Sequence, residues 1–345
     1  MSRHRRDFRN RFERGVAMLS LDTEQIWGYQ DPLFDPLDEH AFQNRYPGAV
    51  EAHDKLLGCL QAAGVGATWL VVGGMALAES AGPGDSRMSG LPARWTVKIP
   101  SGGETTAPLW YRRSFIERLR GGLPLQEIGL HGGLTHLAWT HRGANKDVIR
   151  WELAEGLKAL EQVNLRPRSF SFARDREAHH DLLADHGIQV YRGRTPVLAY
   201  RLGRTLPGAA LRALDELRRS TPPPVWPVEL LPGLWNIPSS LFLYPIGPSR
   251  ARMVALKTRV ERFARGLEAA ARHRGIFHFS LHPENLAESP DGFTLFEDLL
   301  EKLVRVRARG DVEILTMGQA AARMSAQDRP FPIHPRGTET YASHK

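Results

Sequence analysis

The sequence predicts an α/β protein whose strands form a parallel barrel of the TIM type. Short apolar or alternating runs, several of them bounded by glycine, alternate with longer amphipathic stretches along most of the 345 residues. Strands that alternate with helices are joined by right-handed crossovers into a parallel sheet. About seven such units over roughly three hundred residues fit a barrel better than a small open sheet.

The alternative fold is an open doubly wound sheet. A nucleotide-binding version of that sheet would carry a glycine-rich phosphate loop after its first strand, and none follows residues 16–21. The barrel is therefore the favoured prediction.

The expected elements share the periods of strands and of amphipathic helices. The expected strands span residues 16–21, 67–72, 127–130, 169–173, 189–192, 276–281 and 312–315. The expected helices span residues 49–63, 145–162, 178–185, 251–273, 293–309 and 318–324. In residues 251–273, apolar side chains recur at steps of three and four residues, which is typical of a helix with one buried face.

Four segments depart from this rhythm. Residues 79–110 and 194–232 are rich in glycine, proline or serine, and we expect them to cross the barrel mouth rather than to link domains. Residues 1–15 carry six arginines and are expected to form a basic arm. Residues 326–345 are polar and lack periodicity, so we expect an irregular tail.

Composition narrows the class of protein. The net charge of +8 and the pI of 9.9 favour an anionic partner, either a phosphate-linked glycan or an anionic membrane surface. No nucleic-acid-reading motif accompanies the scattered basic residues, so no nucleic acid partner is expected. The sequence shows no secretory signal and no apolar stretch of membrane-spanning length, which predicts a cytoplasmic protein. The single Cys59 excludes an intramolecular disulfide.

Active sites of parallel barrels lie at the carboxyl ends of the strands, and this rule selects the candidate residues. Asp22 and Glu24 follow the first expected strand and would face the same side if that strand continued. Acids at a strand end are also common as turn residues or helix caps. Two carboxylates on one side can instead divide the work between binding a metal and acting as a base.

Histidines follow two other expected strands. His131 and His136 flank Gly132-Gly133 in one loop, and two histidines there leave coordination positions for a carboxylate and a water. His282 ends the strand 276–281, where it can act as a general acid near neutral pH. His278 has the same parity but lies deeper, so we expect a core histidine there.

Arg174 follows the expected strand 169–173 and can hold a catalytic carboxylate in its ionised form. A surface salt bridge with Asp175 or Glu177 is an equally good interpretation of Arg174. Trp95, Trp110 and Trp139 can stack on sugar rings at the barrel mouth or fill the core.

Taken in this order, these segments resemble the polysaccharide deacetylase family, also called the NodB homology or carbohydrate esterase family 4 domain. The resemblance covers about residues 16–325. The most specific part is Glu127-Ile128-Gly129-Leu130-His131 with His136, which is similar to the family's EIG.H...H metal motif. Residues 67–73 resemble its second-strand ATFFV.G motif, residues 182–188 its LL...G motif, and Leu281-His282 its L.H motif.

The resemblance implies a distorted (β/α)7 barrel and N-deacetylation of an acetylated amino sugar. It implies a divalent cation, usually zinc, held by Glu24, His131 and His136. Asp22 then falls on the family's base, His282 on its acid, and Arg174 on the arginine that orients the base. Arg168 also fits that arginine by its distance from the LL...G motif.

Several features depart from the family pattern. The step from His131 to His136 is one residue longer than usual, Glu24 replaces an aspartate adjacent to the base, and the third motif's Arg-Pro-Pro-Tyr-Gly is missing. These departures indicate a divergent branch. Two other functions stay open: a deformylase or other C–N hydrolase of the same superfamily, and a catalytically inactive barrel that binds glycan.

Overall fold

The computed structural model describes residues 11–31, 36–140, 145–198, 202, 205–244 and 254–327. Most of the expected basic arm and residues 328–345 of the expected tail lie outside these ranges. Residues 326 and 327, which were expected to open that tail, still belong to the last helix.

The strands agree with the expected ones, and five more are present. The ten strands of the main sheet are β1 (Gly15–Thr23), β2 (Thr68–Val71), β5 (Glu127–His131), β6 (Ser169–Ser171), β7 (Val190–Gly193), β8 (Val228–Leu231), β9 (Leu234–Pro238), β10 (Leu241–Phe242), β11 (Ile276–Leu281) and β12 (Val312–Ile314). A separate antiparallel pair consists of β3 (Glu79–Ala81) and β4 (Ser101–Gly103).

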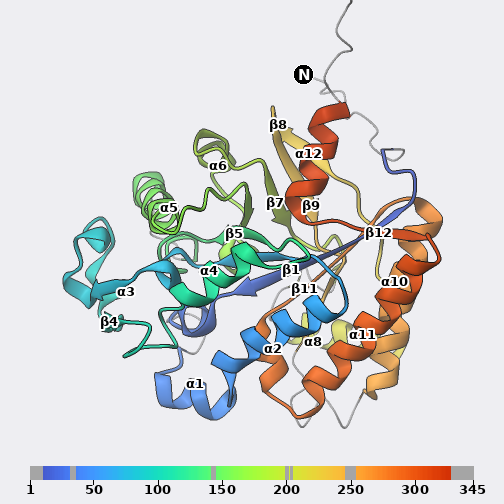
Figure 1. Ribbon diagram of the computed structural model, residues 1–345, viewed down its shortest axis with the longest axis horizontal. Coiled ribbons are helices and arrows are strands. Elements are labelled where there is room, and N and C mark those ends of the chain that lie inside the picture. The colour runs from blue at the N-terminus through green and yellow to red at the C-terminus, as the bar shows by residue number, and fades with distance from the viewer. Residues whose placement is uncertain are drawn as a thin grey trace, which may run out of the picture.

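The main sheet curls into a distorted (β/α)7 barrel, as predicted (Figure 1). Its strands run parallel in the order β10-β11-β1-β2-β5-β6-β7-β9, and β8 joins the outer edge of β9 antiparallel. The chain from β9 to β10 closes the ring: Ser239 N–H donates to the Gly193 carbonyl of β7 at 3.0 Å, and Ser240 N–H to the His278 carbonyl of β11 at 2.6 Å. Because β9 and β10 follow one another on the two sides of this closure, they share one position in the ring, and the barrel has seven strand positions.

The barrel interior changes from apolar to polar along the strands. Alternate residues of β1 point inward, so Val16 and Met18 pack in the inner core cluster, whereas Leu19 and Leu21 pack against the outer helices. Inward positions nearer the carboxyl ends of the strands are polar, and they include Ser20 of β1. The alternation of side chains along β1 therefore places a hydrophobic plug at one end of the barrel and a polar chamber at the other.

Helices surround the sheet (Figure 1). They are α1 (Glu39–Arg45), α2 (Ala49–Ala62), α3 (Ala93–Thr96), α4 (Arg113–Gly121), α5 (Lys146–Glu161), α6 (His180–Asp185), α8 (Leu206–Leu217), α10 (Leu256–His273), α11 (Asp291–Ala308) and α12 (Met317–Gln327). Asn145 caps α5 by accepting from Val148 N–H at 2.9 Å, which satisfies one of the free amides of its first turn. The predicted helix 251–273 is observed from Leu256, and residues 251–253 lie outside the described ranges.

α12 closes the amino ends of the strands. Met317, Ala320 and Met324 pack into the inner core cluster, together with Phe12 from the expected arm. Glu127, the first residue of the EIG segment, accepts from Gly318 N–H at 2.8 Å and so fixes the start of α12 to β5. This glutamate therefore has a structural partner at the end of the barrel opposite to His131.

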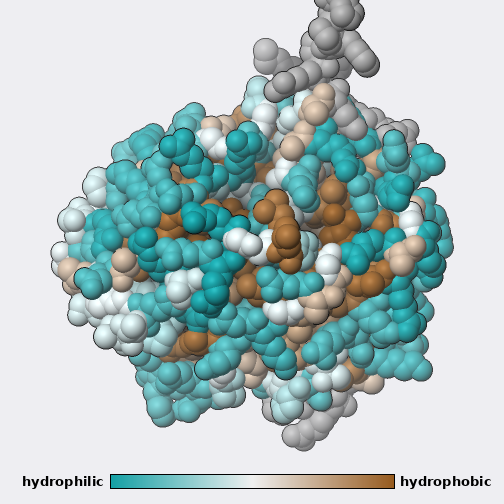
Figure 2. All heavy atoms as spheres, viewed as in Figure 1, coloured by the Kyte–Doolittle hydropathy of each residue, from teal (hydrophilic) through white to brown (hydrophobic). Residues whose placement is uncertain are grey.

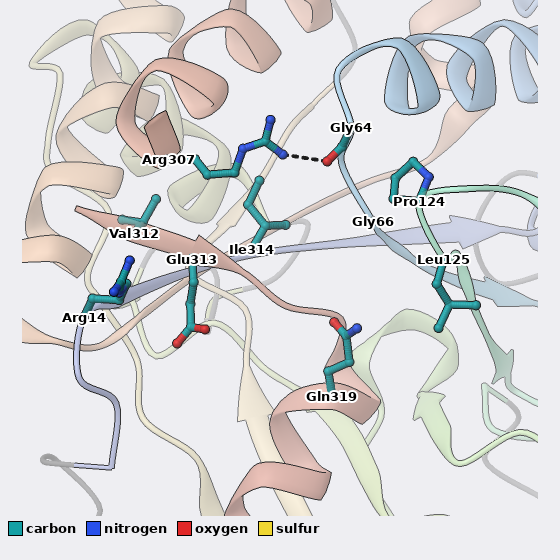
Figure 3. Close-up of a pocket in the computed structure, with 10 residues that line it drawn as sticks. All are labelled: Arg14, Gly64, Gly66, Pro124, Leu125, Arg307, Val312, Glu313, Ile314 and Gln319. Carbon is teal, nitrogen blue, oxygen red and sulfur yellow. Dashed lines mark hydrogen bonds between the residues drawn. The ribbon is translucent and has the colours of Figure 1, made fainter. Parts of the chain in front are cut away.

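A hollow of about 310 Å³ lies at this same amino end (Figure 3). It lies between Arg14, Leu125, Ile314 and the loop at Gly64, whose carbonyl accepts from Arg307 at 2.6 Å. Arg14, Gly64 and Leu125 precede their strands, and Ile314 lies on β12, which pairs with the start of β1. The hollow is therefore separated by the plug from the chamber that holds Asp22.

The segments 79–110 and 194–232, which were expected to cross the barrel mouth, contain different secondary structure. The segment 79–110 forms β3, β4 and α3 and buries Trp95 and Trp110. Trp110 Nε1 donates to Glu39 Oε1 at 2.8 Å. Trp139, in the loop after β5, is buried as well: it is 5% exposed and packs on Phe172. All three tryptophans therefore belong to the core. The second excursion, 194–232, supplies α8 and β8.

Most of the face seen in Figure 2 is hydrophilic, and apolar residues gather in its middle, between α4 and α12. Leu123 and Leu125, in the connection from α4 to β5, are 84% and 57% exposed. Within the described ranges, no helix combines the length and apolar character needed to cross a bilayer.

Candidate metal centre

The carboxyl end of β1 carries both predicted acids into the polar chamber. β1 continues to Thr23, two residues beyond the expected end, because Asp22 and Thr23 pair with Leu70 and Val71 of β2. Asp22 keeps the inward parity of Val16 and Met18 and is 4% exposed. Glu24 follows at once and is 2% exposed.

Glu24 meets the two histidines of the β5 loop. Its Oε2 lies 2.9 Å from Nε2 of His131 and 2.9 Å from Nε2 of His136. Both imidazoles are almost completely buried, and their ring centroids are 4.8 Å apart. Burial alone would raise the pKa of Glu24, but the neighbouring His282 and His136 hold it well below its ordinary value.

The loop between the histidines accommodates their long spacing by two glycines. Gly132 adopts a φ of +75°, a left-handed conformation that side-chain-bearing residues rarely take. A Cβ on Gly133 would collide with the backbone and side chain of Glu152 on α5. Thr135 N–H and Oγ both donate to Glu152 Oε1 at 2.7 Å, which holds the loop on α5 just before His136. The loop between the histidines is thus packed closely on α5.

These three side chains have the donors of a cation site. Two imidazole nitrogens and a carboxylate form the His2Glu set found in catalytic zinc sites, which leave a further position for water or substrate. His131 Nδ1 lies 2.6 Å from Ser171 Oγ of β6, and this contact orients the ring so that Nε2 points at Glu24. The donor set therefore fits a divalent cation.

Arg192 of β7 is the arginine that contacts Asp22. Its Nη2 donates to Asp22 Oδ2 at 2.6 Å, and both side chains are about 4–5% exposed. Burial would raise the pKa of Asp22, but the Arg192 guanidinium outweighs it, with help from His131 and His282, and holds this pKa far below its ordinary value. Asp22 is therefore ionised at neutral pH.

Arg174 was expected in that role, and it makes a hydrogen bond to another part of the chain. It sits in a left-handed conformation after β6 and donates to the Gly28 carbonyl at 2.5 Å. Arg168, the other candidate, is exposed at the amino end of β6, away from the chamber. The sequence reasoning missed Arg192, although Arg192 ends the expected strand 189–192 and so meets the same rule as the other candidates.

A buried chain of hydrogen bonds holds Arg192 in place. Arg192 Nη1 donates to Ser20 Oγ at 3.1 Å, and Ser20 Oγ lies 2.8 Å from His278 Nε2. His278 Nδ1 lies 3.2 Å from the Pro238 carbonyl, so the neutral ring donates there and accepts from Ser20. Burial, with a contribution from Arg192, lowers the pKa of His278 to about 3. His278 is a core histidine, as expected from its position in the strand.

His282 stands between Asp22 and Glu24. Its Nε2 lies 3.5 Å from Asp22 Oδ2, and its Nδ1 lies 3.1 Å from Glu24 Oε1. Burial would lower the pKa of His282, but Glu24, with Asp22 and Glu284, raises it well above the ordinary value. With 17% of its side chain exposed, His282 is the most accessible member of this group.

The structure thus brings Asp22, Glu24, His131, His136 and His282 together at the carboxyl ends of three strands. It adds Arg192 and Ser171, which the sequence reasoning did not select. Glu284 also approaches this group from η6 (Pro283–Ala287).

No family model and no curated protein matches the chain. Solved structures do resemble it. A protein assigned as a polysaccharide deacetylase from Mycobacterium smegmatis is 19% identical, with a TM-score of 0.57 and 91% of each chain covered. A probable polysaccharide deacetylase from Pseudomonas aeruginosa PAO1 is 10% identical, and the PuuE allantoinase is 12% identical. Both have a TM-score of 0.55 and the same coverage.

At these identities the likeness concerns the fold. The chain has the α/β barrel of the solved polysaccharide deacetylases, and the resemblance predicted from its motifs is confirmed at that level.

Proposed function

We propose that this chain is a metal-dependent amide hydrolase that removes the acyl group, most simply acetyl, from the nitrogen of an amino sugar. One observation carries the proposal. Asp22 and His282, an acid–base pair, border the buried group Glu24, His131 and His136 at the carboxyl ends of the strands. A barrel that only binds glycan has no need of an ionised aspartate paired with a buried guanidinium beside a cation site.

Glu24, His131 and His136 would hold the cation, which we take to be Zn²⁺. When bound, such an ion polarises the amide carbonyl and lowers the pKa of a water molecule. The chain's own residues must then move two protons, one from the water and one to the departing nitrogen.

Asp22 is the residue suited to accept the proton of water. Arg192 fixes Oδ2, and Ser171 Oγ lies 3.4 Å from Oδ1, so the carboxylate has a defined orientation. The same contacts keep it ionised, which a general base requires.

His282 is the residue suited to donate a proton to the leaving nitrogen. The raised pKa keeps its imidazole protonated at neutral pH, and its partial exposure leaves it open to a substrate. Amide cleavage needs such a donor because an unprotonated amine is a poor leaving group. The products are a carboxylate and the free amine of the sugar.

The proposed substrate class is supported by the fold and by the net charge of the chain. The fold is that of solved polysaccharide deacetylases, and the charge of +8 favours an anionic partner, such as a phosphate- or lipid-linked sugar or an anionic membrane surface. Formamides and cyclic ureides are the competing substrates, since the allantoinase shares the fold.

The test compares metal content and turnover in two variants. His136→Ala should lose the cation and the activity together, whereas His282→Ala should keep the cation and lose the activity. Acetate, formate or a ureide product from the wild-type reaction identifies the acyl group. Turnover by metal-free His136→Ala would contradict the proposal, and a wild-type chain without a stoichiometric cation would favour the inactive glycan-binding barrel.

A further inference from the structure

The two carboxylate oxygens of Glu24 face two different sets of side chains. Oε2 faces the Nε2 atoms of His131 and His136 at 2.9 Å each. Oε1 lies on the other side, 3.1 Å from Nδ1 of His282. The cation site described above uses only the first of these oxygens.

Glu284 completes a group around the second oxygen. Its Oε1 lies 3.5 Å from His282 Nδ1, and its side chain is 0% exposed. Among the described residues, neither Glu284 oxygen has a hydrogen-bond donor, and His282 Nδ1 has no hydrogen-bond partner. The ion pair with His282 is therefore a contact without hydrogen-bond geometry. A buried carboxylate in this state costs several kcal/mol unless a cation or donor compensates it.

We propose that Glu24 Oε1, His282 Nδ1 and Glu284 form a second divalent-cation site, so that Glu24 bridges two ions. The three donor atoms lie within 4.8 Å of one another. Ligands of a tetrahedral zinc ion at about 2.1 Å are separated by roughly 3.4 Å. The separations of 3.1 and 3.5 Å around His282 Nδ1 match this spacing. A carboxylate that bridges two ions is a common arrangement in two-metal hydrolases.

Charge sets the order of binding. Asp22, Glu24 and Glu284 carry three negative charges, and Arg192 and one divalent ion already balance them. The second ion replaces the proton of the His282 imidazolium and still adds one net positive charge, so it binds more weakly than the first.

The second ion and the acid role of His282 exclude one another. A ring whose Nδ1 binds a cation cannot also be an imidazolium, so occupation of this site removes the proposed proton donor. This consequence rests on the proposed function, whereas the site itself does not. An excess of Zn²⁺ is therefore expected to slow amide cleavage by the wild-type chain.

The experiment counts ions. The chelator-treated full-length chain is titrated calorimetrically with Zn²⁺, and bound metal is measured after gel filtration. The wild-type chain should bind two ions in two steps, and Glu284→Gln should retain the tight step and lose the weak one. Glu288→Gln is the matched control, since Glu288 lies on the same segment and pairs with Arg45 instead. It should still bind two ions, and it keeps every surface histidine that could bind zinc.

Saturation of the wild-type chain at one ion would overturn the proposal, and so would a second step that persists in Glu284→Gln. If Glu284→Gln fails to fold by circular dichroism, Glu284→Asp replaces it and should weaken the second step at least tenfold; an unchanged step again overturns the site. In the amide assay, an undiminished wild-type rate with both ions bound would overturn the exclusion. Absence of turnover by the chain that holds only the first, tightly bound ion would instead refute only the proposed function.

Discussion

Gly28 lies directly over the carboxylate of Glu24. A Cβ built on Gly28 would fall inside the van der Waals radii of the Glu24 carboxyl carbon and oxygens. Gly28 belongs to η1 (Gln25–Tyr29), which the chain enters through a left-handed Gln25, and its carbonyl accepts from Arg174. The backbone of η1 therefore covers the cation site closely, and only glycine leaves room for Glu24.

Gly28→Ala should consequently displace Glu24 and lower the affinity for the cation. The atoms in conflict are the end of a side chain, so the carboxylate can rotate away while the fold persists. We expect at least a tenfold loss in Zn²⁺ affinity by calorimetry with a small change in melting temperature. Gly58→Ala is the control, because its Cβ meets nothing within 4 Å and it lies in the helix α2. Alanine there should stabilise the protein by up to about 1 kcal/mol. Unchanged Zn²⁺ affinity in Gly28→Ala would contradict the assignment of Glu24 as a ligand.

Arg192→Lys should reduce turnover and leave the cation in place. Lysine keeps the charge but cannot donate to Ser20 and Asp22 from one planar group, so Asp22 loses its fixed orientation. A misoriented general base costs roughly 10²-fold in rate. The measurement is the turnover number at saturating metal, with metal content determined in parallel. Arg174→Lys tests the competing assignment, and a larger loss in that variant would return the orienting role to Arg174.

The strand-end rule identified most of this site because its signal is local. Asp22, His131 and His282 each stand where an apolar run stops, and the direction of each side chain follows from the parity of its own strand. The barrel was predictable for the same reason. Its inner and outer residues alternate within single strands such as Val16–Leu21.

The remainder depended on contacts between distant segments. β1 reaches Thr23 only because β2 pairs with it, and Arg192 finds its partner 170 positions earlier in the chain. β8, β9 and β10 were not predicted, because prolines 227, 232 and 238 interrupt their alternation. β9 and β10 are stabilised by hydrogen bonds to β7 and β11, and β8 by hydrogen bonds to β9, rather than by a strong local pattern.

Glu152→Gln should flatten the dependence of stability on pH between about 4.5 and 7. Burial raises the pKa of Glu152 to about 7, although hydrogen bonds from Thr135 oppose this. The folded state then binds more protons than the unfolded state in that window, so the wild-type chain loses stability as pH rises through it. The loss is up to about 3 kcal/mol. Glutamine keeps the oxygen that accepts from Thr135 and carries no charge.

Urea unfolding at pH 5 and pH 8 measures the difference in stability between wild type and Glu152→Gln, with the exposed Glu161→Gln as control. Equal pH dependence in wild type and Glu152→Gln would refute this account.

His53→Gln should have the opposite effect on the pH profile. His53 is fully buried on α2, where its Nδ1 lies 2.9 Å from the Ala49 carbonyl, and burial lowers its pKa to about 4. Between about pH 6.5 and pH 4 the unfolded chain takes up a proton that the folded chain excludes, so stability falls as pH falls through this window. This contribution amounts to up to about 3 kcal/mol. Glutamine does not titrate, so the unfolding free energy of His53→Gln should lose less between pH 7 and pH 4 than that of the wild type. The exposed His40→Gln serves as control and should follow the wild-type curve. A His53→Gln profile that coincides with the wild-type profile would mean that His53 binds a proton equally well in the folded and the unfolded chain.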